Sequence, residues 1–411
     1  MKHRWITVVA SCLMILAMVA AFCLSCGKGG EEGKVTIVVG NISDMTGPAA
    51  TALVPINYAM QDLANYFNDH NLIPDVTIKV VTYDARYDPS RDVPGWEALK
   101  EKGATVMVTA LPTTAETLKS FAESDKIPLW SLTASPALLD PPGWVFCSEP
   151  PTSALVKTLL EWISINDADF PTGRRAKIGS AGWEEPYAIA LKDAVKQYAQ
   201  AHPDKFEWVA GLLAPMGVMT WSGEVEALKN CDYVLPPSTG TGMSTFMKEY
   251  RDKGYTAKFI GTSAHCAYRG LAIDALGWAG VDGMLTSQPG RWWNETSPVV
   301  DIGNTLLQEK HSAQADDIVH SGIGYIGSFQ QLYAFYQVLQ QTIADVGAKN
   351  FDGQAFYDTA TKFKTTWEGD QEWNFTSAKR YNWNYIGIYE WSAQQGDLVR
   401  KVPEWLPLVL D

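Results

Sequence analysis

Cysteine and histidine, the side chains from which zinc and redox sites are built, are scarce in this sequence. Six of each are spread over 411 residues without a CxxC spacing, and the histidines stand singly, so no zinc pattern forms. We therefore expect no metal and no cofactor. The odd number of cysteines beyond the N-terminus leaves at least one thiol unpaired, and we expect buried free thiols at Cys147, Cys231 and Cys266. Cys231 and Cys266 fall near opposite ends of neighbouring predicted strands, which disfavours a disulfide between them.

Basic residues are also in deficit. Lysine and arginine number 33 against 46 acids, which gives a net charge of −13, and no cluster of basic residues with interleaved aromatics occurs. This balance argues against nucleic acid and anionic membrane surfaces as partners. Charged residues are only 19% of a chain that is 46% hydrophobic, so an ordered protein is expected. A chain of 411 residues exceeds the usual size of a single core, so two domains are the default expectation.

The N-terminus carries the one long apolar run, Ile6–Leu24. Lys2 and Arg4 precede it and small residues follow it, which is the layout of a secretory signal, although a run of this length could also span a membrane. Leu24-Ser25-Cys26-Gly27 resembles a bacterial lipobox, with Cys23 where the pattern favours leucine. We predict a signal peptide over residues 1–26, lipid attachment at Cys26 and a flexible tether over residues 27–34. A lipid-anchored, an uncleaved and an ordinarily cleaved N-terminus would all place the folded part outside the cytoplasmic membrane. Cleavage would remove Lys2 and Arg4 and so lower the net charge to −15.

Two polar turns follow neighbouring strands in the stretch Thr105–Ser135. It predicts a buried strand (105–109), a turn, an amphipathic helix (114–124), a second strand (127–131) and a second turn (133–135). Ligands of open α/β sheets lie outside the carboxyl ends of parallel strands. Both ends here carry Thr or Ser and no His, Cys or acid. Such a site suits the holding of a small polar group better than the breaking of a bond.

Strands and helices alternate along the rest of the chain, which predicts parallel sheets with helices on both faces. A first unit runs to the Pro-rich segment Pro141–Ala154, and a second runs from there to about Asp282–Gly283. Helices at 299–310 and 321–346 are expected to return to the first unit. The second of these helices carries five aromatic residues and a leucine at helical spacing, a set that is typical of a core: Tyr325, Phe329, Leu332, Tyr333, Phe335 and Tyr336. A third crossing is expected at Trp367–Trp373, before a closing hairpin.

Four segments in this order resemble a known family: VTIVVGNISDMTGP (35–48), IKVVTYDARYDPSR (78–91), TALPTTAE (109–116) and IPLWSLTASPAL (127–138). Together they are similar to branched-chain-amino-acid type periplasmic solute-binding proteins, the receptors of ABC importers, over about residues 34–396. The resemblance implies a type I periplasmic binding fold, in which two doubly wound parallel-sheet lobes are joined by three crossovers around a ligand cleft. The lobes would comprise residues 34–149 with 286–367, and 150–285 with 368–411. It also implies a monomer that delivers a small solute to membrane permease subunits.

The resemblance also implies positions that contact the ligand. Thr113 and Thr114 would hold a carboxylate, Thr133, Ala134 and Ser135 would hold an amino group, and Tyr187 would close over the ligand. Ser238 and Thr239 lie in the next strand-end turn. Ordinary structural roles remain open, since Thr114 could cap a helix and Ser135 precedes a proline. Further residues could face the cleft or serve the core: Trp183, Glu184, His265, Trp292 and Tyr325.

The sequence departs from amino-acid-binding members in Gly261–His265. Ser263 stands where those members supply a glutamate to the ligand's ammonium group. Since an unpaired buried ammonium is costly, either Glu184 or Glu185 replaces that glutamate or the ligand lacks an ammonium group, as amides, small carboxylates and aromatic acids do.

Catalysis is not expected from this sequence. Ser263 and His265 lie close together, but GTSAH is not a GxSxG motif and no orienting acid is evident nearby. A hydrolase is therefore a remote alternative. A receptor that signals through a partner, instead of feeding a permease, is compatible with the same fold.

Overall fold

The computed structural model describes residues 33–367 and 371–410. The predicted signal peptide, Cys26 and most of the predicted tether lie outside the described residues, so lipid attachment stays a prediction. No helix within the described ranges is both long enough and apolar enough to cross a membrane.

The first lobe is built on a five-stranded sheet with the strand order β2-β1-β3-β4-β5. Strands β1, β3, β4 and β5 run parallel to one another. The strands of this sheet are β1 (Val35–Ser43), β2 (Val76–Asp84), β3 (Ala104–Thr109), β4 (Leu129–Ser131) and β5 (Val145–Cys147). The helices that accompany it early in the chain are α2 (Ala50–Asp69), α3 (Asp92–Glu101), α4 (Pro112–Asp125) and α5 (Pro136–Leu139), with the short 3-10 helix η1 (Pro89–Arg91) before α3.

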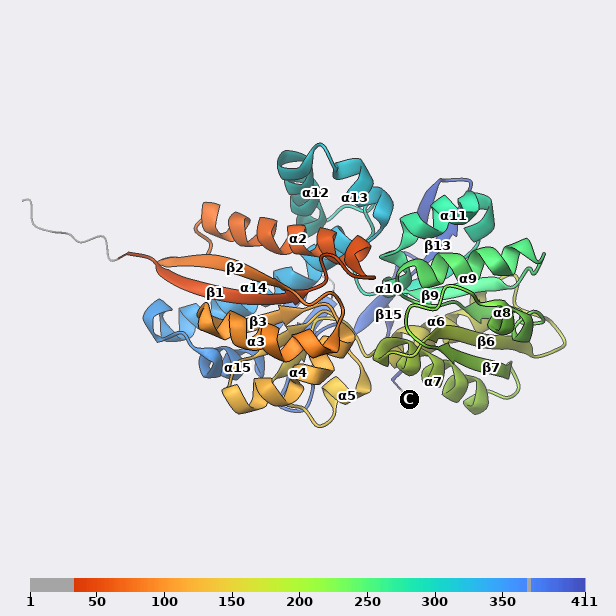
Figure 1. Ribbon diagram of the computed structural model, residues 1–411, viewed down its shortest axis with the longest axis horizontal. Helices are drawn as coiled ribbons and strands as arrows, with labels where there is room; N and C mark the ends of the chain where they lie inside the picture. The colour runs from red at the N-terminus through yellow and green to blue at the C-terminus, as the bar shows by residue number, and fades with distance from the viewer. Residues whose placement is uncertain (1–32, 368–370, 411) are drawn as a thin grey trace, which may run out of the picture. The chain divides into compact units, whose positions relative to one another are not determined.

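Later helices complete this lobe. They are α12 (Pro298–His311), α13 (Ala315–Ser321), α14 (Gly324–Val346) and α15 (Gly353–Ala360), with the 3-10 helix η2 (Ala348–Asn350) between the last two. Side chains alternate across the sheet, as the period of a strand requires. In β1, Ile37 and Val39 pack into the core shared with α2 and α14, whereas Val38 and Ile42 pack toward α3 and α4. Helices therefore cover both faces of the sheet (Figure 1).

The second lobe contains an eight-stranded sheet with the order β14-β13-β10-β9-β8-β6-β7, and β15 pairs with β13. Strands β6 to β10 pair in parallel, whereas β13 pairs antiparallel with its neighbours. The parallel strands are β6 (Ala176–Trp183), β7 (Phe206–Ala214), β8 (Tyr233–Leu235), β9 (Lys258–Thr262) and β10 (Leu285–Gln288). The closing strands are β13 (Tyr385–Ser392), β14 (Asp397–Arg400) and β15 (Leu406–Pro407).

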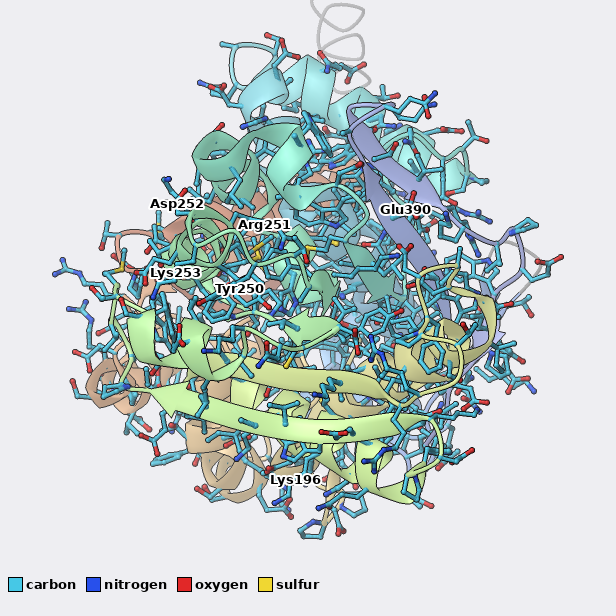
Figure 2. All side chains as sticks on the ribbon, turned by 90° about the vertical axis from the view of Figure 1, so that its right-hand side faces the viewer. Lys196, Tyr250, Arg251, Asp252, Lys253 and Glu390 are labelled. Carbon is cyan, nitrogen blue, oxygen red and sulfur yellow. The ribbon has the colours of Figure 1, made fainter. Side chains whose placement is uncertain are left out.

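Helices also cover both faces of this larger sheet. They are α6 (Thr152–Asn166), α7 (Pro186–Ala201), α8 (Ser222–Ala227), α9 (Gly240–Asp252), α10 (Ser263–Cys266) and α11 (Arg269–Val281). Figure 2 shows Tyr250 and Lys253 at the end of α9 on one side of the strands and Lys196 of α7 on the other side. Tyr250 is buried, whereas Lys196 and Lys253 are exposed, so each helix turns its apolar side toward the sheet.

The chain passes between the lobes three times. The first passage joins β5 to α6, the second joins β10 to α12, and the third joins the hairpin β11 (Lys364–Trp367) and β12 (Gln371–Asn374) to β13. The first and third run side by side, because the Cys147 N–H donates to the Arg380 carbonyl at 2.7 Å. The predicted lobe boundaries stay predictions; β10 belongs to the larger sheet and continues three residues past the boundary predicted at residue 285.

Local structure differs from the sequence prediction near two predicted elements. The helix predicted over 321–346 is present as α14 but begins three residues later, at Gly324. Gly322 separates it from α13, a helix that was not predicted; its φ of 135° favours glycine, and an added Cβ would lie 1.9 Å from the Cys266 carbonyl oxygen. The predicted turn after β9 contains the short helix α10. The aromatic side chains predicted for the core are buried, except for the partly exposed Tyr333. Cys147, Cys231 and Cys266 are buried free thiols, as predicted.

Candidate ligand-binding site

A cavity of about 120 Å³ lies at the carboxyl ends of the parallel strands of both sheets. The first lobe contributes Tyr87 after β2, Leu111 after β3, Thr133 after β4 and Glu149 after β5, together with the first turns of α2 and α14. The second lobe contributes Tyr187 after β6, Ser238 and Thr239 after β8, Ser263 after β9 and Pro289 after β10. The cavity therefore occupies the position in which open α/β sheets bind their ligands.

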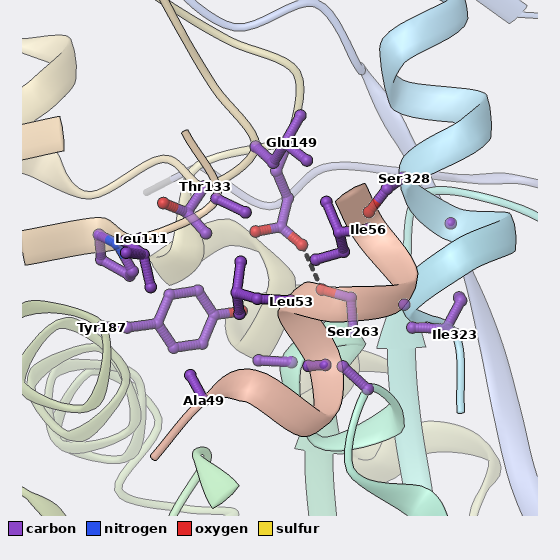
Figure 3. A pocket seen from close by; sticks show the side chains of 18 of the residues that line it. Ala49, Leu53, Ile56, Leu111, Thr133, Glu149, Tyr187, Ser263, Ile323 and Ser328 are labelled. Atoms are coloured by element: carbon purple, nitrogen blue, oxygen red, sulfur yellow. Dashed lines mark hydrogen bonds between the residues drawn. The ribbon is translucent and has the colours of Figure 1, made fainter. Parts of the chain in front are cut away.

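Most of the lining is apolar. Ala49 and, from α2, Leu53 and Ile56 form one wall of the cavity (Figure 3). Ile323 and Ser328 line it from the first turns of α14. Hydroxyl groups are scattered over this apolar surface, and Tyr187 extends into it from the second lobe. The Tyr187 hydroxyl lies 3.0 Å from Thr262 Oγ1 and is thereby fixed in place. A wall of this kind fits a solute with an apolar body and a few polar groups.

Glu149 is the one carboxyl group among the lining residues that the structure describes, and no lysine, arginine or histidine is among them. Its side chain is 3% exposed, and Ser263 Oγ donates a hydrogen bond to Oε1. Burial raises the pKa of Glu149 to about 8, and the bond from Ser263 opposes this shift only in part.

Five of the residues predicted from the sequence line the cavity: Thr133, Tyr187, Ser238, Thr239 and Ser263. Other predicted positions do not. Thr114 Oγ1 donates to Asp92 Oδ1 at 2.8 Å and caps no helix, since α4 begins at Pro112. Thr113 is partly buried and does not line the cavity.

Only part of the second predicted turn, residues 133–135, lines the cavity. Thr133 faces the cavity, whereas the hydroxyl of Ser135 donates to Glu116 and the Ala134 carbonyl accepts from Thr152 Oγ1 at 3.0 Å. Ala134 and Ser135 are buried and do not line the cavity. They join the start of α5 to α4 and α6 instead.

The two glutamates at the start of α7 take different positions, and neither lines the cavity. Glu184 is exposed, and its N–H donates to Ala214. Glu185 is buried and caps α7, because its carboxylate accepts from the N–H groups of Tyr187 and Ala188 at 2.9 and 2.7 Å. Burial raises the pKa of Glu185 to about 7, and these two hydrogen bonds oppose the shift only in part.

The remaining predicted candidates also lie outside the lining. Trp183 Nε1 donates to the Val218 carbonyl at 2.9 Å, and Trp292 Nε1 donates to Asp397 Oδ1 at 2.7 Å. The Tyr325 hydroxyl donates to Asp62 Oδ2 at 2.8 Å, between α14 and α2. All three side chains are buried with these partners.

His265 is fully buried with both ring nitrogens occupied. Nδ1 accepts from the Thr262 N–H at 3.0 Å, and Nε2 donates to the Pro236 carbonyl at 3.1 Å. Burial lowers the pKa of His265 to about 4, so the ring stays neutral. Ser263 donates to Glu149 and not to His265, so the two residues do not form a nucleophile and base pair. Within residues 33–367 and 371–410, no three His, Cys, Asp or Glu side chains come together as a metal site would require.

Three residues important to the cavity were missed in the sequence: Tyr87, Glu149 and Tyr268. Tyr87 and Glu149 follow strands β2 and β5, so the strand-end rule that selected Thr133 could also have selected them. Glu149 stands in the Pro-rich segment 141–154, whose composition predicts only a crossover between the lobes.

Comparisons with known proteins agree with this geometry. The model of a family described as "Periplasmic binding protein" matches residues 36–396. A branched-chain amino acid ABC transporter protein from Thermus thermophilus, solved with bound valine, superposes with a TM-score of 0.78 at 16% identity, over 92% of this chain and 97% of that one.

Two further solved structures are similar. A solute-binding protein of an ABC transporter from R. palustris, in complex with 4-hydroxybenzoate, has a TM-score of 0.74 at 16% identity, over 91% of this chain and 97% of its own. A fatty acid ABC transporter substrate-binding protein from Thermomonospora curvata has a TM-score of 0.75 at 17% identity, over 92% and 93%. A comparison with curated proteins finds no match. At these identities the similarity establishes the two-lobed fold and leaves the ligand open.

Proposed function

Because the chain belongs to the periplasmic binding protein family, whose members bind solutes and are not enzymes, we propose that it is the extracytoplasmic receptor of an ABC importer. It holds one small amphipathic solute in the cavity between its lobes and presents the closed form to permease subunits. The observation that carries the proposal is the lining itself, which comes from strand ends of both sheets and is apolar with a few hydroxyls. A solute that contacts both lobes favours closure by the contacts it makes only in the closed state.

The cavity volume limits the size of the solute. About 120 Å³ is close to the ~150 Å³ of a buried apolar cavity that accepts benzene. A single ring or a branched chain of a few carbons fits such a space, whereas a long acyl chain does not. Branched-chain and aromatic amino acids, their amides and the corresponding small acids are therefore the solutes to test.

We expect one of these solutes to raise the unfolding midpoint of the purified protein. Binding to the native state alone adds about 2.7 kcal/mol of stability at a hundredfold excess over the dissociation constant. Thermal unfolding against a panel of such amino acids, amides, short-chain acids and aromatic acids measures this. A midpoint that no member of the panel raises would contradict the proposal.

A cavity-blocking variant tests whether the solute binds at this site. Ala267 lines the cavity and is partly exposed, so Ala267→Trp fills the space with little cost to the core. We expect this variant to lose the solute-induced shift, by at least about tenfold in affinity, while its midpoint without solute stays near that of the wild type. Ala227→Trp on exposed α8 is the matched control and should bind as the wild type does. Equal loss in both variants would place binding elsewhere.

A further inference from the structure

Glu149 is held in a fixed position by its neighbours in sequence. It is the last residue before Pro150 and Pro151 in the first passage between the lobes. A residue before proline is restricted to extended backbone conformations, so the backbone that carries this side chain has little freedom. One carboxylate oxygen accepts from Ser263 Oγ, which belongs to the start of α10 in the second lobe. In Figure 3 the other oxygen faces the open space near Thr133 and Tyr187.

No positive charge compensates this buried carboxyl group among the lining residues that are described. The titratable groups that act on it or respond to it from the elements packed around it are the Cys147 thiol of β5 and the Tyr187 phenol of α7. Burial raises the pKa of both, so both are neutral at physiological pH. The pKa of Glu149 is itself raised to about 8 by burial. A buried acid without a counter-ion is costly to ionise unless a ligand supplies the positive charge.

We infer that Glu149, oriented by Ser263, is the subsite that binds a positively charged nitrogen of the solute, so the solute is a small amine or amino acid with an apolar body. The inference rests on the proposed function and names the solute class. A carboxylate in the same place would gain at most one hydrogen bond, from protonated Glu149, and the lining offers no basic side chain to balance its charge. An ammonium group gains a charge-assisted hydrogen bond to the free oxygen of Glu149.

Binding of such a solute must release a proton. Below pH 8 the empty site carries Glu149 as a neutral acid, whereas the ion pair requires the carboxylate. The solute arrives as R–NH₃⁺, the Glu149 O–H bond breaks, and the proton leaves to the solvent while the carboxylate pairs with the ammonium. At pH 6.5 about one proton is therefore released per solute bound. A nitrogen-free acid that is held by the protonated carboxyl group releases none.

The test is calorimetric titration at pH 6.5 in two buffers that differ in their heat of ionisation. The probes are valine, leucine, isobutylamine and phenethylamine, and the nitrogen-free counterparts isovalerate, benzoate and phenylpropionate. We expect binding by at least one probe with an ammonium group, with release of about one proton. Glu149→Gln should weaken it about 100-fold and abolish the release. Exposed Glu184, which does not line the cavity, provides the matched control, and Glu184→Gln should keep both affinity and release.

The outcomes separate the inference from the proposed function. If nitrogen-free acids bind in preference, or if an amine binds without proton release and Glu149→Gln retains its affinity, the inference is wrong and the receptor function stands. If no probe of either group binds, both are contradicted. The proton count is measured on the wild-type protein, so it decides the matter even if Glu149→Gln folds poorly.

Discussion

At pH 9 and without solute, Glu149→Gln is expected to be more stable than the wild type by on the order of 4 kcal/mol, whereas at pH 4 the two should unfold alike. Burial raises the pKa of Glu149 from 4.5 to about 8. Between these values the unfolded chain has lost its proton and the folded protein still holds it, so folding is penalised increasingly as pH rises. One pKa unit corresponds to about 1.4 kcal/mol, and the penalty is complete above the folded pKa.

Glutamine has nearly the same shape as glutamate, cannot ionise, and its amide oxygen can still accept from Ser263 Oγ. The variant therefore removes the pH-dependent penalty and little else. Glu185, whose pKa is raised to about 7, titrates in both proteins and cancels in the difference. The measurement is urea denaturation from pH 4 to pH 9. Glu184→Gln should follow the wild-type curve, because Glu184 is exposed. Parallel curves for wild type and Glu149→Gln would show that Glu149 is not buried without a counter-ion.

The alternation of strands and helices made the fold predictable, because each strand is a short apolar run and each polar turn marks a carboxyl end. Strand positions such as 233–235 are found where the pattern placed them. Helix breaks were less predictable. The break at Gly322 depends on the approach of the Cys266 carbonyl, which belongs to the second lobe, and no local pattern records that contact.

The turns that line the cavity could be predicted from the sequence, but not which side chain of each turn faces it. Thr114 is turned toward Asp92 because α4 starts two residues earlier than its amphipathic pattern indicates. Glu184 and Glu185 are adjacent, and β6 extends to Trp183, so one carboxylate faces solvent and the other caps α7. A shift of one residue in where a helix or strand begins or ends therefore changes which side chain faces the cavity.

Glu149 shows a different limit of the sequence. The position after β9 carries Ser263 where a carboxylate was expected, and the sequence suggested Glu184 or Glu185 at the start of α7 as its replacement. The carboxylate that reaches Ser263 lies 114 residues away in the chain. A contact of that separation follows from the packing of the two lobes. From the local sequence alone, Glu149 could be identified only as an acidic residue at the end of a strand.

Trp130→Ala is expected to lower the free energy of unfolding by about 3–5 kcal/mol, the usual cost of removing a buried aromatic side chain. Trp130 is 1% exposed in β4. Its ring centroid lies 5.4–6.5 Å from four phenylalanine rings, those of Phe146, Phe335, Phe356 and Phe375. These rings belong to β5, α14, α15 and the third passage between the lobes, so one side chain joins four separate segments. Chemical denaturation of the solute-free protein measures the loss.

A smaller substitution separates packing from hydrogen bonding at this position. No described residue accepts a hydrogen bond from Trp130 Nε1, so Trp130→Phe removes a buried unpaired N–H along with part of the ring and should cost about 1–2 kcal/mol. Trp278→Ala on partly exposed α11 is the matched control and should cost less than Trp130→Ala. Equal losses for the two tryptophan-to-alanine variants would contradict the central role of Trp130. Because Trp130 does not line the cavity, Trp130→Phe should bind solute with wild-type affinity, and weaker binding would mean that this aromatic cluster also sets the relative position of the lobes.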